Sequence, residues 1–359
     1  MTAVSARPYC VPVIFKKKPE APDLGTVISE LEQAVEARDG GRTETAFAAV
    51  LTVVQSATDA ECAAAGPRLA ALLPLFPPVG PRPMLAMAAG FCVERGADPL
   101  ACAEPVLDAV REDLLAAREF ARLWGAGELP EPDEKIIDAG LAARLGLDGD
   151  EYEATRLALA WCALEQWQPP ALAVLCRSAE VRRRHAAALL SVCRELAALE
   201  QHDLKCLAYA LAVLDDEPLV VLHRPTGRGF EVRIGGIGDN FQLHTLLAHT
   251  LVGGGHLPGT APCAESVRLA TDPAPAQGMS GVVALGAFEL LAPDGERIWN
   301  EGLPDDIPVV DGRRLLVLDE PVYPRSWNAD RFFPHLAGSA ELIRVLPDDE
   351  TRTWFARTA

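Results

Sequence analysis

The sequence predicts two architectures in one chain, an all-helical region followed by a smaller mixed α/β domain. Apolar residues recur at helical spacing from about residue 24 to residue 215, as in amphipathic helices. After Asp215-Asp216 the pattern changes to short runs of apolar and β-branched residues, separated by turns that contain glycine or proline. The length of 359 residues is enough for about two domains.

We expect the chain to divide into three segments. Residues 1–23 would form a basic N-terminal tail, residues 24–215 an all-helical domain, and residues 216–359 a mixed α/β domain. Helices with a single apolar stripe must pack against neighbours to bury it. The sequence shows no repeat with a period of about 30 to 47 residues. An irregular bundle and a HEAT-like solenoid therefore both remain open.

The helical stripes can be followed along the first domain. The first stripe, over residues 28–35, is expected to end at Gly40-Gly41. The prolines within residues 74–83 predict a connector between two helical subsets, because proline cannot continue a helix. Further stripes lie over residues 47–54, 107–124, 157–164, 181–199 and 204–214.

One helical stripe carries unusual polar residues. His185 lies on the apolar seam of residues 181–199, which is typical of a hydrogen-bonded core histidine. Beside it, Arg182-Arg183-Arg184 is a basic run in an otherwise acidic region. Such a run is solvated, pairs within the chain, or receives a phosphate or carboxylate.

The second domain is expected to begin with a β-hairpin of residues 219–223 and 230–234, followed by a helix over Asp239–Val252. Further strands are expected over residues 282–291, 297–299, 307–310, 314–318 and 341–346, with a short helix over Ala329–Leu336 and a last helix over residues 348–357. The order strand, helix, strand, helix at the end predicts a βαβ unit and a local parallel strand pair.

A Gly/Pro-rich loop is expected over residues 253–280. It holds five glycines and four prolines, and we expect order only over Ser266–Ala270, as a strand. A stretch of this length inside a compact domain is typical of a lid or a partner-binding loop, or of a mobile excursion. The sequence leaves these alternatives open.

The net charge of −18 is unevenly distributed. Residues 1–18 carry four basic residues and no acid, residues 19–216 carry 17 basic and 32 acidic residues, and residues 217–359 carry 12 and 19. An acidic body repels a phosphate backbone, so we expect no non-specific nucleic-acid binding. The same charge favours a basic partner, and the tail could fold back on the body or stay solvated.

The cysteines and the apolar runs indicate a cytoplasmic protein. The nine cysteines are odd in number, form no CxxC pair and sit mostly in apolar helical runs, as buried reduced thiols do. The basic N-terminus lacks the apolar core of a signal peptide, and the longest apolar runs are interrupted by proline or charge, so we expect no membrane segment. The excess of Arg over Lys is typical of a GC-rich bacterial genome.

The turn from Gly235 to Gln242 follows an expected strand and opens an expected helix. It could direct backbone N–H groups at an anion, but it is neither a dinucleotide-binding motif nor a P-loop. Asp239 followed by Gln242 resembles a capping box, which is the simpler interpretation. His244 and His249 lie about 140° apart around a helix. With His256 they therefore do not predict a metal site.

The loop over Asp319–Asn328 is the best candidate site. It follows an apolar strand, two prolines stiffen it, and arginine and exposed aromatics are typical of binding surfaces. The residues that we expect to bind are Glu320, Tyr323, Arg325, Trp327 and Asn328. The structural alternatives are Asn328 as a helix N-cap, Trp327 in the core, and an ion pair between Arg325 and Glu320.

The sequence is best interpreted as a protein that acts by binding another macromolecule, as an adaptor, an immunity protein or a biosynthetic accessory protein. The alternative is an enzyme for a small anionic or peptide substrate, with Asp239, His244 and Arg325 as catalytic residues. A third reading is a small-molecule sensor with a pocket between the domains. None of these readings requires a cofactor or a metal. No sequence motif decides whether the chain is an enzyme or sets its oligomeric state.

Overall fold

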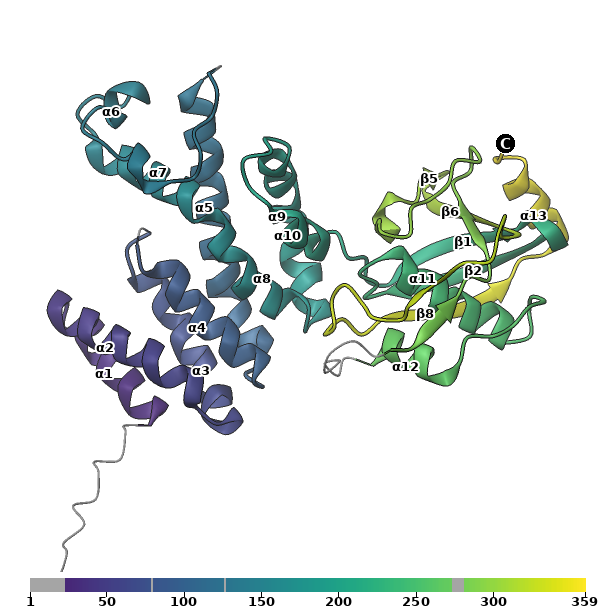
Figure 1. Ribbon diagram of the computed structural model, residues 1–359, viewed down its shortest axis with the longest axis horizontal. Helices are drawn as coiled ribbons and strands as arrows, with labels where there is room; N and C mark the ends of the chain where they lie inside the picture. Colours follow the sequence, from purple (N-terminus) through teal and green to yellow (C-terminus); the bar gives the residue numbers. More distant parts are fainter. Residues whose placement is uncertain (1–22, 79, 126, 273–280) are drawn as a thin grey trace, which may run out of the picture.

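The protein combines a helical region with a mixed α/β region, as the sequence predicts (Figure 1). The computed structural model describes residues 23–359 apart from residues 79, 126 and 273–280. The tail expected over residues 1–23 lies outside the described residues except for Asp23, which caps the first helix. Within the described part of the chain, no helix is both long and apolar enough to cross a membrane.

Ten α-helices make up the described helical region. They are α1 (Leu24–Glu36), α2 (Gly40–Val53), α3 (Asp59–Leu72), α4 (Arg82–Glu94), α5 (Pro99–Trp124), α6 (Leu141–Arg144), α7 (Glu151–Ala163), α8 (Gln168–Leu175), α9 (Ala179–Ala197) and α10 (Lys205–Leu211). Gly40-Gly41 does not end α1 as expected but begins α2. The reason is that Asp39 accepts a hydrogen bond from the Arg42 amide and caps the second helix.

Helix α5 lies at the centre of the helical core. It has 26 residues against 13 or 14 in α1 to α4, and it packs against α3, α4, α7, α8 and α9. A single hydrophobic core runs from Leu24 to Val213. The proline-rich stretch over residues 74–83 therefore joins two neighbouring helices, α3 and α4, within that core and does not separate two subsets.

The helical core contains a buried carboxyl group and most of the cysteines. Asp113 is 3% exposed, and one of its oxygens accepts a hydrogen bond from Trp167 Nε1 at 2.7 Å while the other has no partner. Burial raises the pKa of Asp113 to about 6. All eight cysteines within the described residues are free, and burial raises the pKa of Cys102 to about 12.

The second region is built on a six-stranded sheet in the order β4-β6-β1-β2-β8, with β5 beside β6. The strands are β1 (Glu217–His223), β2 (Arg228–Gly235), β4 (Glu289–Leu291), β5 (Val309–Val310), β6 (Arg313–Asp319) and β8 (Ser339–Val345). The expected hairpin is confirmed as β1 and β2. A separate two-stranded ribbon pairs β3 (Val283–Leu285) with β7 (Ser326–Asn328).

Helices cover both faces of this sheet. Alternate residues of β1 face opposite sides, so Leu219 and Val221 pack with α11 (Asn240–Leu247), while Val220 and Leu222 pack with α13 (Asp348–Phe355). The expected helix over Asp239–Val252 is present as α11 and a π-helix over Ala248–Gly253.

Four expectations for this region are wrong. The strand expected over residues 297–299 is absent, since only Arg297 makes an isolated bridge, to Leu291. Strand β8 pairs antiparallel with β2, so there is no βαβ unit at the end, and the one parallel pair among the described strands is β1 with β6. Ser266–Ala270 belongs to helix α12 (Ala264–Thr271) and not to a strand. Residues 329–336 form no helix, and the rest of the loop expected over 253–280 includes residues outside the described part of the chain.

The segment over residues 329–336 instead joins the two regions. Phe333 and Leu336 are buried in the hydrophobic core of the helical region. Arg331 holds the bend by donating to the carbonyl oxygens of Pro334 and Leu336. The apolar residues whose spacing predicts a helix therefore pack against the helical region instead. Pro334 also disfavours a helix at this point.

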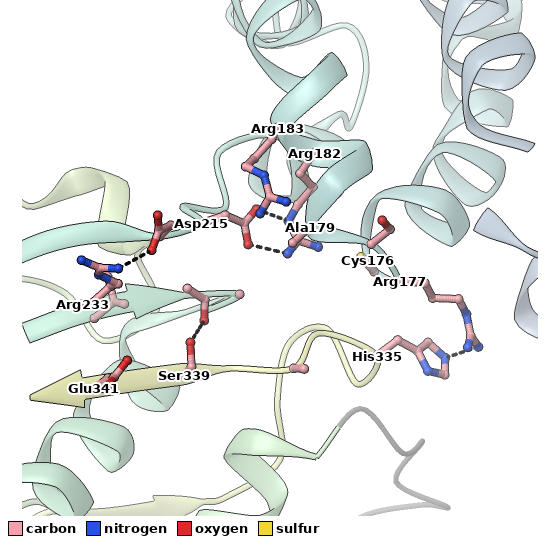
Figure 2. A pocket seen from close by; sticks show the side chains of 16 residues that line it. Cys176, Arg177, Ala179, Arg182, Arg183, Asp215, Arg233, His335, Ser339 and Glu341 are labelled. Carbon is pink, nitrogen blue, oxygen red and sulfur yellow. Dashed lines mark hydrogen bonds and ion pairs between the residues drawn. The ribbon is translucent and has the colours of Figure 1, made fainter. Parts of the chain in front are cut away.

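The basic run on α9 contributes to the same junction. Arg182 is 5% exposed and donates two hydrogen bonds to Asp215, at 2.8 and 2.7 Å, so it pairs within the chain (Figure 2). Arg184 pairs with Glu180 one turn earlier, whereas Arg183 is exposed. His185 is half-buried at the edge of the core rather than inside it.

Candidate functional site

The candidate loop leaves the sheet at the end of β6 and returns as β7. Asp319, the last residue of β6, pairs with Arg224 at 2.9 Å. Glu320 is exposed at the start of the loop, and Tyr323 is 52% exposed near its tip. The final residues of the predicted loop are a strand, because Ser326–Asn328 pairs with Val283–Leu285. The loop is therefore anchored by strands at both ends.

Arg325 is fixed to a buried carboxylate on a neighbouring strand. Its guanidinium donates to Glu289 Oε2 at 2.8 Å, and Arg297 pairs with Glu289 Oε1 at 2.5 Å. The structural alternative, an ion pair between Arg325 and Glu320, is therefore wrong. Glu289 is 3% exposed, and a buried carboxylate needs such partners to offset its lost hydration.

Sequence reasoning missed Glu289 and Arg297. A signal was present for Glu289, since it is a single acid within the otherwise apolar run from Phe288 to Leu291. A lone carboxylate in a buried strand requires a charged partner. Nothing in the sequence shows that this partner lies 36 residues further along the chain, at Arg325.

Trp327 is half-buried and turned towards helix α11. Its ring lies 4.9 Å from the His244 ring, in an edge-on arrangement, and 5.2 Å from the Phe241 ring. This contact joins the β3–β7 ribbon to α11. Trp327 thus has a packing role, in line with the structural alternative, and it contributes only part of its surface to solvent.

The outer face of the β3–β7 ribbon is exposed and carries two apolar side chains beside Ser326 and Asn328. Side chains alternate along each strand, so Ala284 and Trp327 face inward while Val283 and Leu285 face solvent, at 54% and 67% exposure. Asn328 pairs in register with Val283 on that outer face, and it is a strand residue rather than a helix N-cap.

This outer face continues into the loop. Val322 and Tyr323 are 77% and 52% exposed, and the Arg325 guanidinium lies 5.9 Å from the centre of the Tyr323 ring. The Gly286 amide, next to Leu285, donates to the Arg325 carbonyl oxygen at 2.8 Å. We call the four exposed apolar residues Val283, Leu285, Val322 and Tyr323 the loop surface.

His244 is held as a neutral hydrogen-bond acceptor. It is 1% exposed, and its Nε2 accepts hydrogen bonds from the amides of Ala287 and Phe288, both at 3.1 Å. The desolvation of the ring lowers the pKa of His244 to about 4. The lone pair that a general base would use is thus already engaged by two backbone donors.

Asp239 is the N-cap of α11. Its Oδ1 accepts from the Gln242 amide at 2.7 Å, and its Oδ2 accepts from the Phe332 amide at 3.2 Å. The Gln242 side chain accepts from Gly238, not from Asp239, so the capping box is incomplete. Burial raises the pKa of Asp239.

The start of α11 is closed to a phosphate group. The amides of Asn240 and Phe241 donate to the carbonyl oxygens of Gly302 and Asn300, at 3.0 and 3.2 Å. These are the N–H groups that an anion at a helix start would need. Among the described residues, neither Asp239 nor His244 hydrogen-bonds to a side chain of the 319–328 loop.

The other histidines of this domain lie apart from His244. His249 is exposed on the π-helix, and His256 packs edge-on against Phe230 with the ring centres 6.3 Å apart. Within the part of the chain that the structure describes, no three His, Cys, Asp or Glu side chains are grouped as metal ligands.

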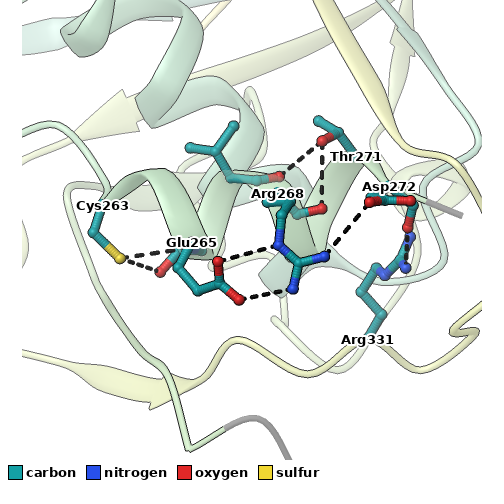
Figure 3. A network of polar contacts seen from close by, with 8 residues as sticks. Cys263, Glu265, Arg268, Thr271, Asp272 and Arg331 are labelled. Atoms are coloured by element: carbon teal, nitrogen blue, oxygen red, sulfur yellow. Dashed lines mark hydrogen bonds and ion pairs between the residues drawn. The ribbon is translucent and has the colours of Figure 1, made fainter. Parts of the chain in front are cut away.

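Helix α12 presents a thiol at its start (Figure 3). Cys263 is exposed and caps the helix, and its sulfur lies 3.1 Å from the Ser266 hydroxyl. The hydrogen bonds from Ser266 lower the pKa of Cys263. Further along the helix, Arg268 pairs with Glu265 and Asp272, and Arg331 donates to the Asp272 carbonyl oxygen.

Comparisons with protein-family models, with curated proteins and with solved structures find no match to this chain. The functional assignment therefore depends on the geometry of the residues described above.

Proposed function

We propose that this protein acts by binding another protein, and that the loop surface makes the contact. The observation that carries the proposal is the exposure of four large apolar side chains on adjoining segments, at 52% to 77%. Large apolar side chains that are exposed close together are typical of interaction sites. A partner that covers Val322 and Tyr323 would remove this apolar area from water, which favours association.

The buried contacts beneath the loop surface favour binding without rearrangement. Glu289 anchors Arg325 and Trp327 packs on α11, so the end of the loop that enters β7 is held by buried contacts. The other end is held by β6, which pairs with β4. A surface that is already ordered loses less conformational entropy when it binds. Aromatic residues next to arginine are also the types that dominate binding energy in protein interfaces.

The charge of the chain indicates the chemistry of the partner. The exposed Glu320 borders the loop surface, and the residues 19–216 and 217–359 are both net acidic. We therefore propose an apolar segment flanked by Lys or Arg as the occupant, because complementary charge speeds association and excludes acidic competitors. An adaptor, immunity or accessory protein of the bacterial cytoplasm would fit this role.

The test compares proteins captured by the wild-type chain and by the double variant Val322→Ala/Tyr323→Ala. These residues are exposed, so their replacement leaves the fold intact. Arg325 and Trp327 are unsuitable for the test, because their removal would disturb Glu289 and α11. The matched control is Tyr152→Ala, since Tyr152 is 63% exposed on α7.

We expect the double variant to lose a partner that the wild type and Tyr152→Ala both retain. Loss of two interface anchors typically costs 2 kcal/mol or more, or about 30-fold in affinity. Equal recovery of every partner by all three proteins would contradict the proposal.

A further inference from the structure

An apolar groove crosses the first three helices, on the side of the helical region far from the sheet (Figure 1). It consists of two adjoining hollows of about 690 and 940 Å³, which share Val35, Arg38 and Leu75. Its walls are the end of α1, the first turns of α2, the end of α3 and the connector over residues 74–81. The groove shares no residue with the loop surface, so it carries an inference independent of the proposed function.

Aromatic and aliphatic side chains form the inner surface of the groove. Phe47 and Phe76 are buried there, with their ring centres 5.7 Å apart. Leu75 lines both hollows and is 64% exposed. Pro74 and Pro77 stiffen the wall beside it, because proline fixes the backbone angle φ. A further apolar segment in the groove would remove Leu75 from water, which favours its binding.

The groove also carries free charges, of which two are negative and one is positive. Glu36 and Glu44 are exposed in the lining, and within the described residues neither makes an ion pair. Arg68 is held by Glu32 at 2.6 Å, whereas Arg38 is exposed. An apolar segment followed by basic residues therefore complements the groove in both apolar surface and charge.

The chain itself contains such a segment ahead of α1. Residues 9–15, with the sequence YCVPVIF, carry no charge, and Lys16–Lys18 follow them directly. The segment lies outside the described part of the chain. Its seven uncharged residues are the longest uncharged run of the basic tail that contains aromatic side chains at both ends. Burial of such a run in an apolar groove is favourable.

The connection to α1 is long enough for this segment to reach the groove. Helix α1 runs from Leu24 to Glu36, a distance of about 18 Å along its axis. The five residues 19–23 span up to about 17 Å when extended. A chain that runs back along α1 can therefore bring Lys16–Lys18 beside Glu36 and residues 9–15 into the groove.

We propose that residues 9–15 dock in this groove of their own chain, with Lys16–Lys18 beside Glu36. The docked segment covers Leu75 and closes the groove to other proteins. A short tether gives the segment an effective concentration in the millimolar range, which favours it over a free competitor.

The experiment measures how fast iodoacetamide alkylates Cys10 in the full chain, by mass spectrometry of a digest. The exposed Cys263 serves as the internal reference. The groove variant is Leu75→Asn, and its matched control is Leu100→Asn, since Leu100 is 41% exposed on α5 and lines neither hollow. A second variant, Phe15→Ser, changes only the tail, so its result does not depend on the fold of the groove variant.

We expect Cys10 to react at least about fivefold faster in Leu75→Asn and Phe15→Ser than in the wild type, because loss of one buried apolar side chain weakens docking by about that factor or more. Leu100→Asn should react at the wild-type rate. Equal rates of Cys10 in the wild type, Leu75→Asn and Phe15→Ser would overturn the proposal, as would faster reaction in Leu100→Asn.

Two further arms distinguish other arrangements of the tail. Protection of Cys10 that increases with protein concentration would overturn the proposal in favour of docking on a second copy of the chain. Faster reaction of Cys10 in Val322→Ala/Tyr323→Ala would overturn it by placing the tail on the loop surface. We expect neither effect.

Discussion

Replacing His244 with glutamine separates its structural role from a catalytic one. The imidazole Nε2 accepts two backbone hydrogen bonds in the folded protein. A glutamine carbonyl oxygen can accept the same bonds, but it does not take up a proton. The variant should therefore fold. The pH dependence of its free energy of unfolding should differ from that of the wild type only in the pH range in which His244 takes up a proton.

The magnitude follows from the pKa of His244, which burial lowers from 6.5 to about 4. The unfolded chain takes up this proton near pH 6.5, whereas the folded chain resists it until about pH 4. Acidification through this window therefore favours unfolding of the wild type. At about 1.4 kcal/mol per pH unit the full effect is about 3 kcal/mol, of which about 2 kcal/mol is reached at pH 5.

The assay is urea denaturation followed by circular dichroism at pH 7.5 and pH 5, at low protein concentration because the isoelectric point is about 4.8. We compare the free energies of unfolding of the wild type and His244→Gln, because the contributions of other titrating groups cancel in their difference. We expect this difference to shift by about 2 kcal/mol between the two pH values. The control is the same substitution at His249, which is exposed on the π-helix. A shift below about 0.5 kcal/mol for His244→Gln would refute the buried neutral imidazole.

Three further predictions concern other buried or exposed groups. Asp113→Asn should raise the free energy of unfolding, measured by urea denaturation, by about 3 kcal/mol at pH 8 and by much less at pH 4. The reason is that the folded-state pKa of Asp113 is about 6, so the folded protein bears the cost of a buried charge only above that pH. Cys263 should react with iodoacetamide before the buried thiols, and Ser266→Ala should slow that reaction, as peptide mapping would show. Arg182→Ala leaves a buried carboxylate unpaired and should cost about 3 to 5 kcal/mol, whereas Arg184→Ala should cost less than about 0.5 kcal/mol in the same denaturation assay.

Local patterns predicted the helices and the hairpin well. The spacing of apolar residues and the helix caps depend only on neighbouring positions in the sequence. The stripe over residues 181–199 therefore predicts a helix, which the structure has as α9. The apolar and β-branched runs on either side of the glycine turn in residues 219–234 likewise predict β1 and β2. The failures have a different cause. Pairing of β8 with β2 spans about a hundred residues, and no local pattern encodes it.

The structure confirms a loop over residues 320–325, but residues 326–328 are a strand and the contacts inside the segment differ from those expected. The exposure of Tyr323 follows from its place between two prolines, whereas the partner of Arg325 depends on how β4 lies beside β6. Ala329–Leu336 has helical apolar spacing, but Phe333 and Leu336 bury themselves in another region of the chain. In both cases tertiary packing overrides the local signal.

The most direct test of the binding role is photo-crosslinking from the loop surface. A benzophenone amino acid at position 322 is compared with the same amino acid at position 152, both exposed in the free protein. The account predicts that position 322 forms a discrete adduct with a second protein, which Tyr323→Ala weakens, and that position 152 does not form this adduct. Adducts of the same proteins at both positions, or none at position 322, would contradict it.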